Sequence, residues 1–389
     1  MSNGEAALKE SYTLEELERR MCPPPPDPEQ IVPAFEKRNV AICIVSSDEY
    51  SPFAGIVVHS IIANASEGNN YDIVILSDNM TVANHRRLRG LAGERKNISI
   101  RIINIERLIS GLNFYTWAHF TTKSYYRLLV PDLFSEYEKV VYLDSDIVVN
   151  NDIAEMFAYD LDGFYMGAAY DTHIVGVCQQ KPDHEQKAYN RETLKMENPE
   201  EYFQAGVSLY NIAAIRRDYA EGYLIEQASK HNLRWLDQDL VNMLFHKKIK
   251  RLPAKWNVMV ANIPGDVREY FMDEDILREY IEARLDPYII HYVGHAIPCF
   301  TDTPDLYDIF WHYARQTPYY EVLLQLMATE SVKRTAPLCL PYNTQRHPPQ
   351  KVHIRFKKRF KRVIDFFLPR GTKRRLFVYK MYVRMFGWE

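Results

Sequence analysis

Short apolar segments rich in β-branched residues alternate with helical segments through the first third of the chain. Strands are predicted at residues 39–45, 71–77 and 98–105, with helices at 51–65 and 81–93 between them. Strands joined by helical crossovers predict an α/β fold, a mostly parallel sheet with helices on both faces. Such sheets bind ligands at the carboxyl ends of their strands. The loop "SSDEY" at residues 46–50 directly follows the first strand, so it is a candidate ligand loop.

Composition places the chain among globular proteins. Its 389 residues, 47% of them hydrophobic, suffice for one large α/β domain with appendages. No apolar run approaches the roughly 18 residues that a membrane span needs, and the charged N-terminus lacks the apolar segment of a secretory signal. The five cysteines are scattered without a CxxC pair, which favours reduced thiols. These features predict a cytoplasmic chain.

Four parts are expected along the chain. Residues 1–36 are predicted to form a short helix, begun by the capping box "TLEE", and a proline-rich linker containing "CPPPPDP". The α/β domain is predicted over residues 37–300. A helical extension at 301–345 and a basic tail at 346–389 complete the chain.

The segment "VVYLDSDIVV", residues 140–149, places two carboxylates inside an apolar run. The segment is predicted to be a buried strand, so Asp144 and Asp146 are expected to point to the same face. Buried carboxylates need compensation, so a basic side chain or a metal ion is expected beside them. The alternative is an Asp-Ser-Asp turn that caps the next helix, but a surface turn would be expected to bring Gly, Pro or Asn in place of these apolar flanks.

Glycine-rich phosphate motifs are absent from the sequence. It contains neither GxGxxG nor GxxxxGK[ST], so neither a dinucleotide-binding Rossmann domain nor a P-loop is supported. A bound diphosphate would need another source of positive charge. A divalent cation held by the two aspartates can supply it, because the ion bridges carboxylate and phosphate oxygens.

Four motifs in order resemble glycosyltransferase family 8 over about residues 38–300. They are the segment from "TTKSYYRLL" through "VVYLDSDIVVNNDIAEMF", then "YFQAGVSLYNI", "LDQDLVNMLF" and "HYVGHAIP". The resemblance implies a GT-A type fold in the α/β domain. It also implies transfer of a hexose, galactose or glucose, from a UDP-sugar with retention of configuration.

The resemblance implies that the metal ligands of the family fall on Asp144, Asp146 and His291 in this sequence. Carboxylate oxygens with one imidazole suit Mn²⁺, with Mg²⁺ as the alternative ion. For His291 alone, a core histidine is the competing interpretation. Asp237 and Gln238 take the catalytic positions beneath the sugar, although Asp237 could instead cap a helix.

The resemblance also implies contacts to the donor and the acceptor. Arg127 matches an arginine that faces the donor, and Lys123, one helical turn earlier, is expected to share its face; a surface ion pair is the alternative for Arg127. Asp171 is the candidate acceptor contact, and His119 aligns less securely. The predicted donor-binding set is Asp48, Lys123, Arg127, Asp144, Ser145, Gln204 and Gly294.

A mechanism follows from the neutral side chain of Gln238. An amide is a poor nucleophile, so a covalent glycosyl-enzyme is disfavoured if no carboxylate lies nearby. Same-face attack is expected instead, with the departing UDP oxygen taking the proton of the acceptor hydroxyl. The protein would then contribute positioning and electrostatics.

The sequence departs from the family pattern at several positions. Ile297 stands where the family often has a lysine that contacts the diphosphate, a charge that His295 would have to replace. Cys299 replaces the usual tryptophan, and Gln204 replaces the usual asparagine. Asp48 lies in "SDEY" where the family usually has "DDNY". The metal ligands are retained, so the departures affect mainly the expected identity of the donor.

The basic tail carries a separate prediction. Residues 351–389 hold 13 Lys/Arg and 2 Asp/Glu, a charge of +11, against −14 for the rest of the chain. Phe356, Phe360, Ile364 and Phe367 share one helical face among the cations, which predicts an interfacial helix on an anionic membrane. Packing of this helix onto the domain is one alternative. Nucleic acid is not an expected partner, since no nucleic-acid module precedes the tail.

The expected partners are therefore a UDP-hexose, a glycan or glycolipid acceptor and the inner face of the cell membrane. The acceptor is predicted to be a lipopolysaccharide or another cell-surface glycan intermediate. A catalytically inactive adaptor with the same fold is the non-enzyme alternative, which Ile297 favours. A sugar nucleotidyltransferase is the other alternative, but "SSDEYSPF" lacks the glycine-rich loop it needs.

Overall fold

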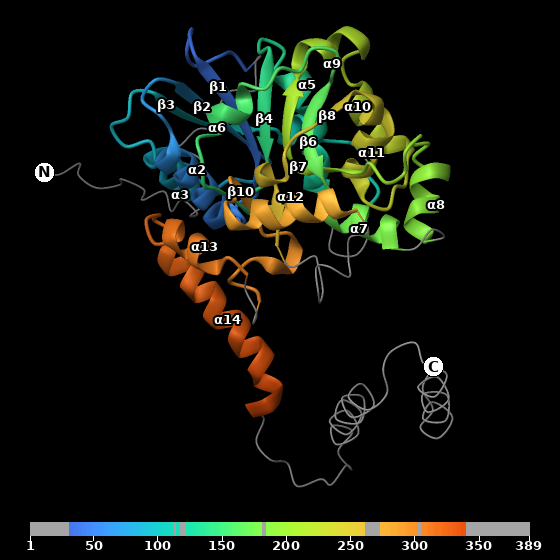
Figure 1. Cartoon of the computed structure of the whole chain (residues 1–389). Helices are drawn as coiled ribbons and strands as arrows, with labels where there is room; N and C mark the ends of the chain where they lie inside the picture. Colours follow the sequence, from blue (N-terminus) through green and yellow to red (C-terminus); the bar gives the residue numbers. More distant parts are fainter. Residues whose placement is uncertain are drawn as a thin grey trace, which may run out of the picture. The chain divides into compact units, whose positions relative to one another are not determined.

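The computed structural model describes six stretches of the chain (Figure 1). These are residues 31–112, 114–116, 122–180, 184–260, 273–301 and 305–339. The chain divides into two units after Ser331, and both sheets and the site belong to the first unit. Most of the predicted linker and all of the predicted basic tail at 346–389 lie outside the described residues.

A seven-stranded sheet forms the centre of the first unit. Its order is β3-β2-β1-β4-β7-β6-β8, and β7 alone runs antiparallel to both of its neighbours. A second sheet of three short strands has the order β5-β10-β9. The strands are β1 Asn39–Val45, β2 Asn70–Ser77, β3 Ile98–Asn104, β4 Lys139–Leu143, β5 Ile147–Val149, β6 Met166–Tyr170, β7 Phe203–Asn211, β8 Ile249–Arg251, β9 Val258–Met259 and β10 Ile289–His291.

Helices flank the large sheet on both faces (Figure 1). The α-helices are α2 Ser51–Asn64, α3 Val82–Gly90, α4 Glu106–Ile109, α5 Val130–Leu133, α6 Ile153–Phe157, α7 Thr172–Gln180, α8 Glu185–Glu192, α9 Ile212–Asp218, α10 Tyr223–Lys230, α11 Leu236–Phe245, α12 Glu274–Leu285, α13 Tyr307–Ala314 and α14 Tyr320–Cys339. The 3₁₀ turns are η1 Thr122–Leu129, η2 His246–Lys248, η3 Ala254–Trp256 and η5 Gly294–Ala296. The mostly parallel α/β sheet is confirmed, as are the expected first three strands and the two helices between them.

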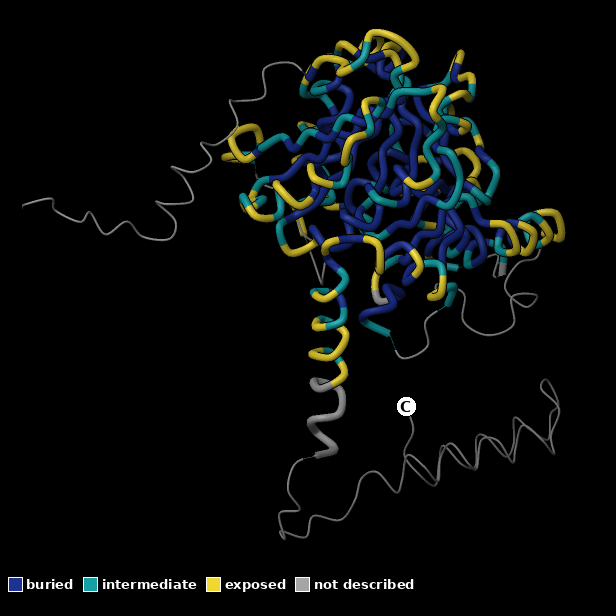
Figure 2. The backbone as a smooth tube through the Cα atoms, turned by 90° about the vertical axis from the view of Figure 1, so that its left-hand side faces the viewer, coloured by how far each residue is buried: buried dark blue, intermediate teal, exposed yellow. Residues whose placement is uncertain are grey.

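The core lies on both faces of the large sheet, where the buried backbone is concentrated (Figure 2). Strand β1 serves both faces because successive side chains point to opposite sides. Ile42 and Ile44 pack in the cluster that includes α2, whereas Ala41, Cys43 and Val45 pack in the cluster that includes η1 and α11. This double burial explains why the strand reads as a continuous apolar run.

The segment 140–149 is not one strand, which corrects the prediction from the sequence. β4 ends at Leu143 in the large sheet and β5 begins at Ile147 in the small one. Asp144 N donates to Gly206 O (2.8 Å) within β7, and Tyr292 N donates to Asp146 O (2.9 Å) beyond β10. The two aspartates therefore occupy a corner where the chain passes from one sheet to the other.

The last residues of the predicted linker are fixed to the sheet by Asp72. Its fully buried carboxylate accepts from Ala34 N (2.9 Å), Tyr137 Oη (2.8 Å) and Arg101 Nη2 (2.8 Å). Arg101 Nη1 in turn donates to Val32 O (2.9 Å). An ion pair between a buried carboxylate and a partly exposed guanidinium, with several hydrogen bonds, thus ties residues 32–34 to β2 and β3.

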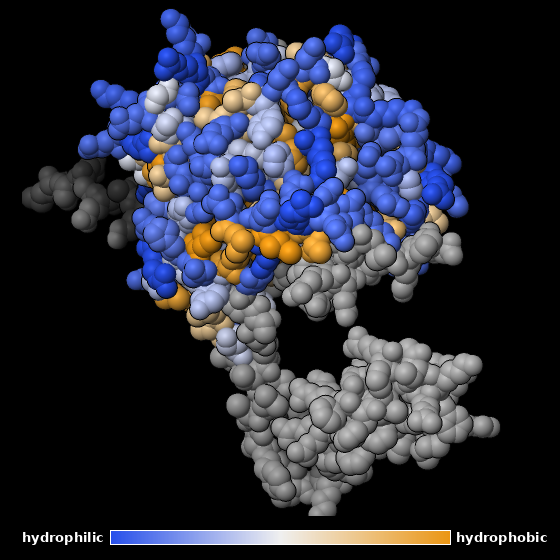
Figure 3. Space-filling view, in the orientation of Figure 1, coloured by the Kyte–Doolittle hydropathy of each residue, from blue (hydrophilic) through white to orange (hydrophobic). Residues whose placement is uncertain are grey.

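One face of the described residues is seen in the space-filling view (Figure 3). Hydrophilic side chains cover most of the face shown in Figure 3. Among the described residues there is no helix with the length and hydropathy required to cross a membrane. Cys43, Cys178 and Cys299 are free and buried, as expected for reduced thiols.

Candidate functional site

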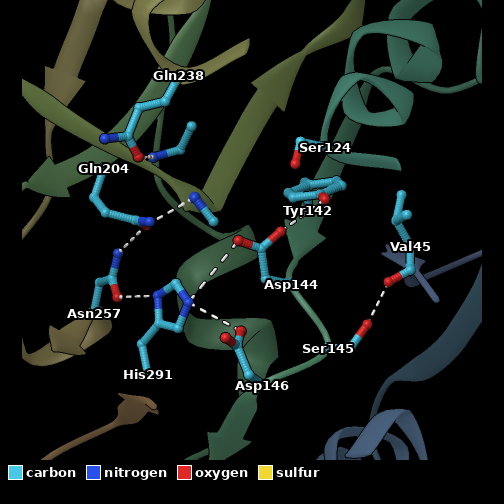
Figure 4. A network of polar contacts seen from close by, with 12 residues as sticks. Val45, Ser124, Tyr142, Asp144, Ser145, Asp146, Gln204, Gln238, Asn257 and His291 are labelled. Atoms are coloured by element: carbon cyan, nitrogen blue, oxygen red, sulfur yellow. Dashed lines mark hydrogen bonds and ion pairs between the residues drawn. The ribbon is translucent and has the colours of Figure 1, made fainter. Parts of the chain in front are cut away.

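The site forms around the corner between β4 and β5 (Figure 4). Ser145 donates its hydroxyl to Val45 O at the end of β1, which anchors the corner to the large sheet. The carboxyl end of β1 and the corner therefore lie together, as the topology of parallel strands predicts.

Asp144, Asp146 and His291 converge at this corner. One ligand atom of each lies within 4.8 Å of the others. His291 Nε2 is 3.1 Å from Asp146 Oδ1 and 3.9 Å from Asp144 Oδ2. Burial acts to lower the pKa of His291, but the charge of Asp146, their hydrogen bond and the charge of Asp144 outweigh it, so the pKa is raised. Two carboxylates and a buried imidazole fit a divalent cation such as Mn²⁺.

The two oxygens of Asp144 have different surroundings. Oδ1 accepts from Tyr142 Oη (2.8 Å) and from Arg127 Nη2 (3.0 Å). Oδ2 lies on the side of His291 (Figure 4). Arg127 Nη2 also donates to Oδ2 over a longer distance (3.4 Å), so the carboxylate is anchored mainly through Oδ1 while Oδ2 faces the predicted metal position.

Arg127 joins Asp144 to Asp237. It is only 7% exposed, and its Nε lies 2.6 Å from Asp237 Oδ2 as an ion pair outside hydrogen-bond geometry. The guanidinium also lies over the ring of Tyr142, 4.8 Å from its centre. The alternative of a surface ion pair is wrong for Arg127, because its two acidic partners belong to the site.

The buried position of Asp237 disfavours the ionised form of its carboxyl group. Burial raises its pKa most, the charge of Arg127 opposes this effect, and Asp144 raises it further, to about 7. At neutral pH this carboxyl is therefore divided between its neutral and charged forms.

Gln238 is held at both ends of its amide. Oε1 accepts from Ala205 N (3.1 Å) on β7, and Nε2 donates to Asp171 Oδ2 (3.0 Å). The other oxygen of Asp171 accepts from Ile174 N (3.0 Å) in α7. Burial raises the pKa of Asp171, and these hydrogen bonds oppose that effect. A covalent intermediate was disfavoured from the sequence only if no carboxylate lay near Gln238. Asp171 does lie beside Gln238, so distance alone does not exclude such an intermediate.

Gln204 contacts a residue that the sequence did not indicate. Its Oε1 accepts from Gly206 N and from Asn257 Nδ2, both at 2.7 Å. Asn257 Oδ1 then lies 3.1 Å from His291 Nδ1. No motif or periodicity relates Asn257 to a histidine 34 positions later.

Lys123 and Arg127 do not share a face, contrary to the expectation from helical spacing. They lie in the 3₁₀ turn η1, where positions four apart point in different directions because the turn has three residues. Lys123 Nζ pairs with Asp78 Oδ1 (2.5 Å), whose other oxygen accepts from Tyr126 (2.8 Å). Asp78, at the end of β2, was missed despite following a predicted strand.

Two predicted donor residues remain, Asp48 in the turn after β1 and Gly294 at the start of η5. Asp48 Oδ1 accepts from Thr81 N (2.7 Å) and Asn84 Nδ2 (2.9 Å) at the start of α3. Gly294 has a left-handed backbone, φ +63°, which glycine adopts most readily. Ile297 and Cys299 are buried in the hydrophobic core. Neither side chain supplies the positive charge of the lysine that the family often has at position 297. His119 and the side chain of His295 lie outside the described residues.

Known proteins resemble this chain in sequence and fold. The family model "Glycosyl transferase family 8" matches residues 41–298. The chain belongs to this family. The glycosyltransferase GlyF of Streptococcus pneumoniae is 26% identical over 245 residues, 61% of this chain and 53% of GlyF. A lipopolysaccharide 1,2-glucosyltransferase of Escherichia coli is 26% identical over 258 residues, 64% of this chain and 70% of that protein. The chain spans about half the length of its pneumococcal relatives GlyF and GlyB.

Solved structures confirm the GT-A type fold. The bifunctional glycosyltransferase WbbM has a TM-score of 0.69 at 30% identity, covering 76% of this chain and 53% of WbbM. An active-site mutant of LgtC has a TM-score of 0.58 at 22% identity, covering 72% of this chain and 96% of LgtC. The family match gives the family membership of the chain, and these structures show its fold.

Proposed function

We propose that this family 8 transferase moves a hexose, galactose or glucose, from a UDP-sugar to a glycan acceptor with retention of configuration. The observation that carries the proposal is the convergence of Asp144, Asp146 and His291 at the carboxyl ends of β1 and β4. These residues would hold Mn²⁺, or Mg²⁺ as the alternative. When bound, the ion supplies the positive charge that a UDP leaving group requires.

The neighbouring side chains support same-face attack. Both oxygens of Asp171 accept hydrogen bonds, one of them from Gln238, and Asp237 is paired with Arg127. These partners lower the nucleophilicity of both carboxylates, which favours same-face attack over a covalent intermediate. Gln238 would face the reacting carbon of the sugar with its amide held by Ala205 and Asp171, and the proton of the acceptor hydroxyl would pass to the departing UDP oxygen.

The donor is tested by release of UDP from a panel of UDP-hexoses, with and without Mn²⁺. Wild-type protein is expected to hydrolyse one UDP-hexose slowly in a metal-dependent reaction, and Asp146→Ala is expected to lose this activity. The exposed Asp162 provides a control, Asp162→Ala, that should behave as wild type. Hydrolysis that is independent of metal and unchanged in Asp146→Ala would refute the metal assignment.

The alternative of an inactive adaptor gains one observation from the structure. Ile297 is 1% exposed and lies among apolar side chains, so no cation stands at the position where the family often has lysine. Nucleotide binding without turnover of any UDP-hexose, even with an oligosaccharide acceptor present, would favour the adaptor.

The acceptor is proposed to be a lipopolysaccharide or other cell-surface glycan intermediate, met at the inner face of the membrane. The support is the likeness to the E. coli lipopolysaccharide glucosyltransferase and the charge of +11 on residues 351–389. Full-length protein is expected to sediment with anionic liposomes, and a variant without residues 351–389 should remain in the supernatant. Equal sedimentation of both proteins would contradict the docking role of the tail.

A further inference from the structure

A buried chain of hydrogen bonds connects β7 to His291 (Figure 4). Gly206 N donates to Gln204 Oε1 (2.7 Å), and Asn257 Nδ2 donates to the same oxygen (2.7 Å). Asn257 Oδ1 then meets His291 Nδ1 at 3.1 Å. The side chains of Gln204, Asn257 and His291 are all buried, so water cannot readily replace a missing partner.

The direction of every hydrogen bond in this chain follows from its first member. A backbone N–H can only donate, so the atom of Gln204 that faces Gly206 must be the carbonyl oxygen. That oxygen cannot donate, so Asn257 must present its NH₂ group to it. The oxygen of Asn257 therefore faces His291, and an oxygen that accepts requires a hydrogen on His291 Nδ1.

We propose that Gln204 and Asn257 are positioning residues, which hold His291 with Nδ1 protonated and Nε2 directed as a ligand toward the cation shared with Asp144 and Asp146. The inference rests on the proposed metal-dependent function. It gives Gln204 a role that the sequence did not suggest, since the oxygen of its side chain serves the histidine. Hydrogen bonds of this kind fix the ring orientation and the tautomer of a ligating histidine, and their loss typically costs about 10- to 100-fold in metal affinity.

The test compares substitutions of similar size that keep or remove an acceptor. Gln204→Met removes the oxygen that orients Asn257, whereas Gln204→Glu keeps an oxygen that accepts from both Gly206 and Asn257. Asn257→Leu removes the acceptor for His291 directly. Asn190 provides a control, because it is also fully buried, accepts from Gln186 (2.9 Å) and donates to Pro199 O (2.8 Å) outside the site.

The measured quantity is the Mn²⁺ dissociation constant, obtained from the electron paramagnetic resonance signal of free Mn²⁺ in titrations of the full chain. Gln204→Met and Asn257→Leu are expected to bind Mn²⁺ about 10- to 100-fold more weakly. Gln204→Glu is expected to bind at least as tightly as wild type, and Asn190→Leu should lose stability without a change in Mn²⁺ affinity. Thermal unfolding shows which variants fold. If Asn257→Leu does not fold, the Mn²⁺ affinity of Gln204→Met decides the test.

A second readout separates positioning from general stability. In metal-free protein at alkaline pH, ¹⁵N shifts of the His291 ring are expected to show the hydrogen on Nδ1 in wild type and Gln204→Glu. A mixture or the Nε2–H form is expected in Asn257→Leu and Gln204→Met. Wild-type Mn²⁺ affinity and an unchanged tautomer in these two variants would overturn the positioning role and leave the proposed function intact. Wild-type protein that binds no Mn²⁺ would overturn both.

Discussion

Replacement of Gly206 by alanine is predicted to damage the metal site more than the fold. A Cβ at this position would lie 2.2 Å from Asp144 Oδ2 and 2.6 Å from His291 Cε1, whereas contacts under 3.0 Å are essentially never seen for a real Cβ. The Asp144 oxygen must therefore move by about 0.8 Å, from 2.2 to 3.0 Å. The cause is the close approach of β7 to the two predicted ligands.

Asp144 has little freedom to make this movement. Its Oδ1 is held by Tyr142 and Arg127, and its backbone N by Gly206 O. Overpacking of this kind costs about 1–3 kcal/mol of stability. A displacement near 1 Å in a reacting constellation can cost about 10²-fold in rate. We expect kcat/KM to fall at least about 100-fold, with Mn²⁺ affinity falling as well.

The assay combines Mn²⁺ titration, UDP release and urea unfolding of Gly206→Ala. Gly167→Ala is the matched control, since Gly167 lies in neighbouring β6 and its Cβ would meet only leucine side chains at 3.2–3.3 Å. This control should bind Mn²⁺ as wild type does, with a small change in stability. Wild-type Mn²⁺ affinity in a folded Gly206→Ala protein would refute the reasoning.

Two further predictions concern buried carboxylates. Because the pKa of Asp237 is raised to about 7, the folded state favours its protonated form, and metal-free wild type should lose stability as pH rises from about 4 through 7. Asp237→Asn should therefore gain stability relative to wild type between pH 5 and 8, by roughly 1–4 kcal/mol in urea unfolding; parallel pH profiles would contradict this. Asp72→Asn should lower the free energy of unfolding by about 2–3 kcal/mol, less than for a fully buried pair because Arg101 is partly exposed. It should also speed proteolysis near residues 31–36, whereas Asp275→Asn, which breaks an exposed pair, should change neither.

The parallel half of the large sheet was predictable from local sequence. The apolar segments that became β1, β2 and β3 alternate with helical segments, and each carries its own signal in side-chain type and spacing. The corner at residues 144–146 was not predictable in this way. Strand-forming residues run on both sides of it, and the break arises because β7 and β10, distant in sequence, pair with the two halves.

The residues of the candidate site were likewise predictable from the sequence only in part. Motif order was sufficient to predict Asp144, Asp146 and His291 as one group, and these residues do converge. The burial of Arg127 was not predictable, because a 3₁₀ turn replaces the assumed α-helix. Gly206 left a usable signal, since a glycine inside a strand often marks a close approach of other groups. Asn257 left none.

The charges around Asp144 argue for a cation site over a structural ion-pair network. Asp144 and Asp237 share the guanidinium of Arg127, and among the described residues the ion pairing of Asp146 is with the imidazole of His291. The pKa values of Asp237 and His291 are both raised, so both groups favour protonation in the folded protein. Burial is the largest cause of the raised pKa of Asp237, Arg127 opposes it and Asp144 adds to it, so one guanidinium does not offset the burial and the neighbouring carboxylate. Arg127 therefore supplies only part of the compensation that the buried carboxylates require, and a divalent cation between Asp144, Asp146 and His291 would supply the rest.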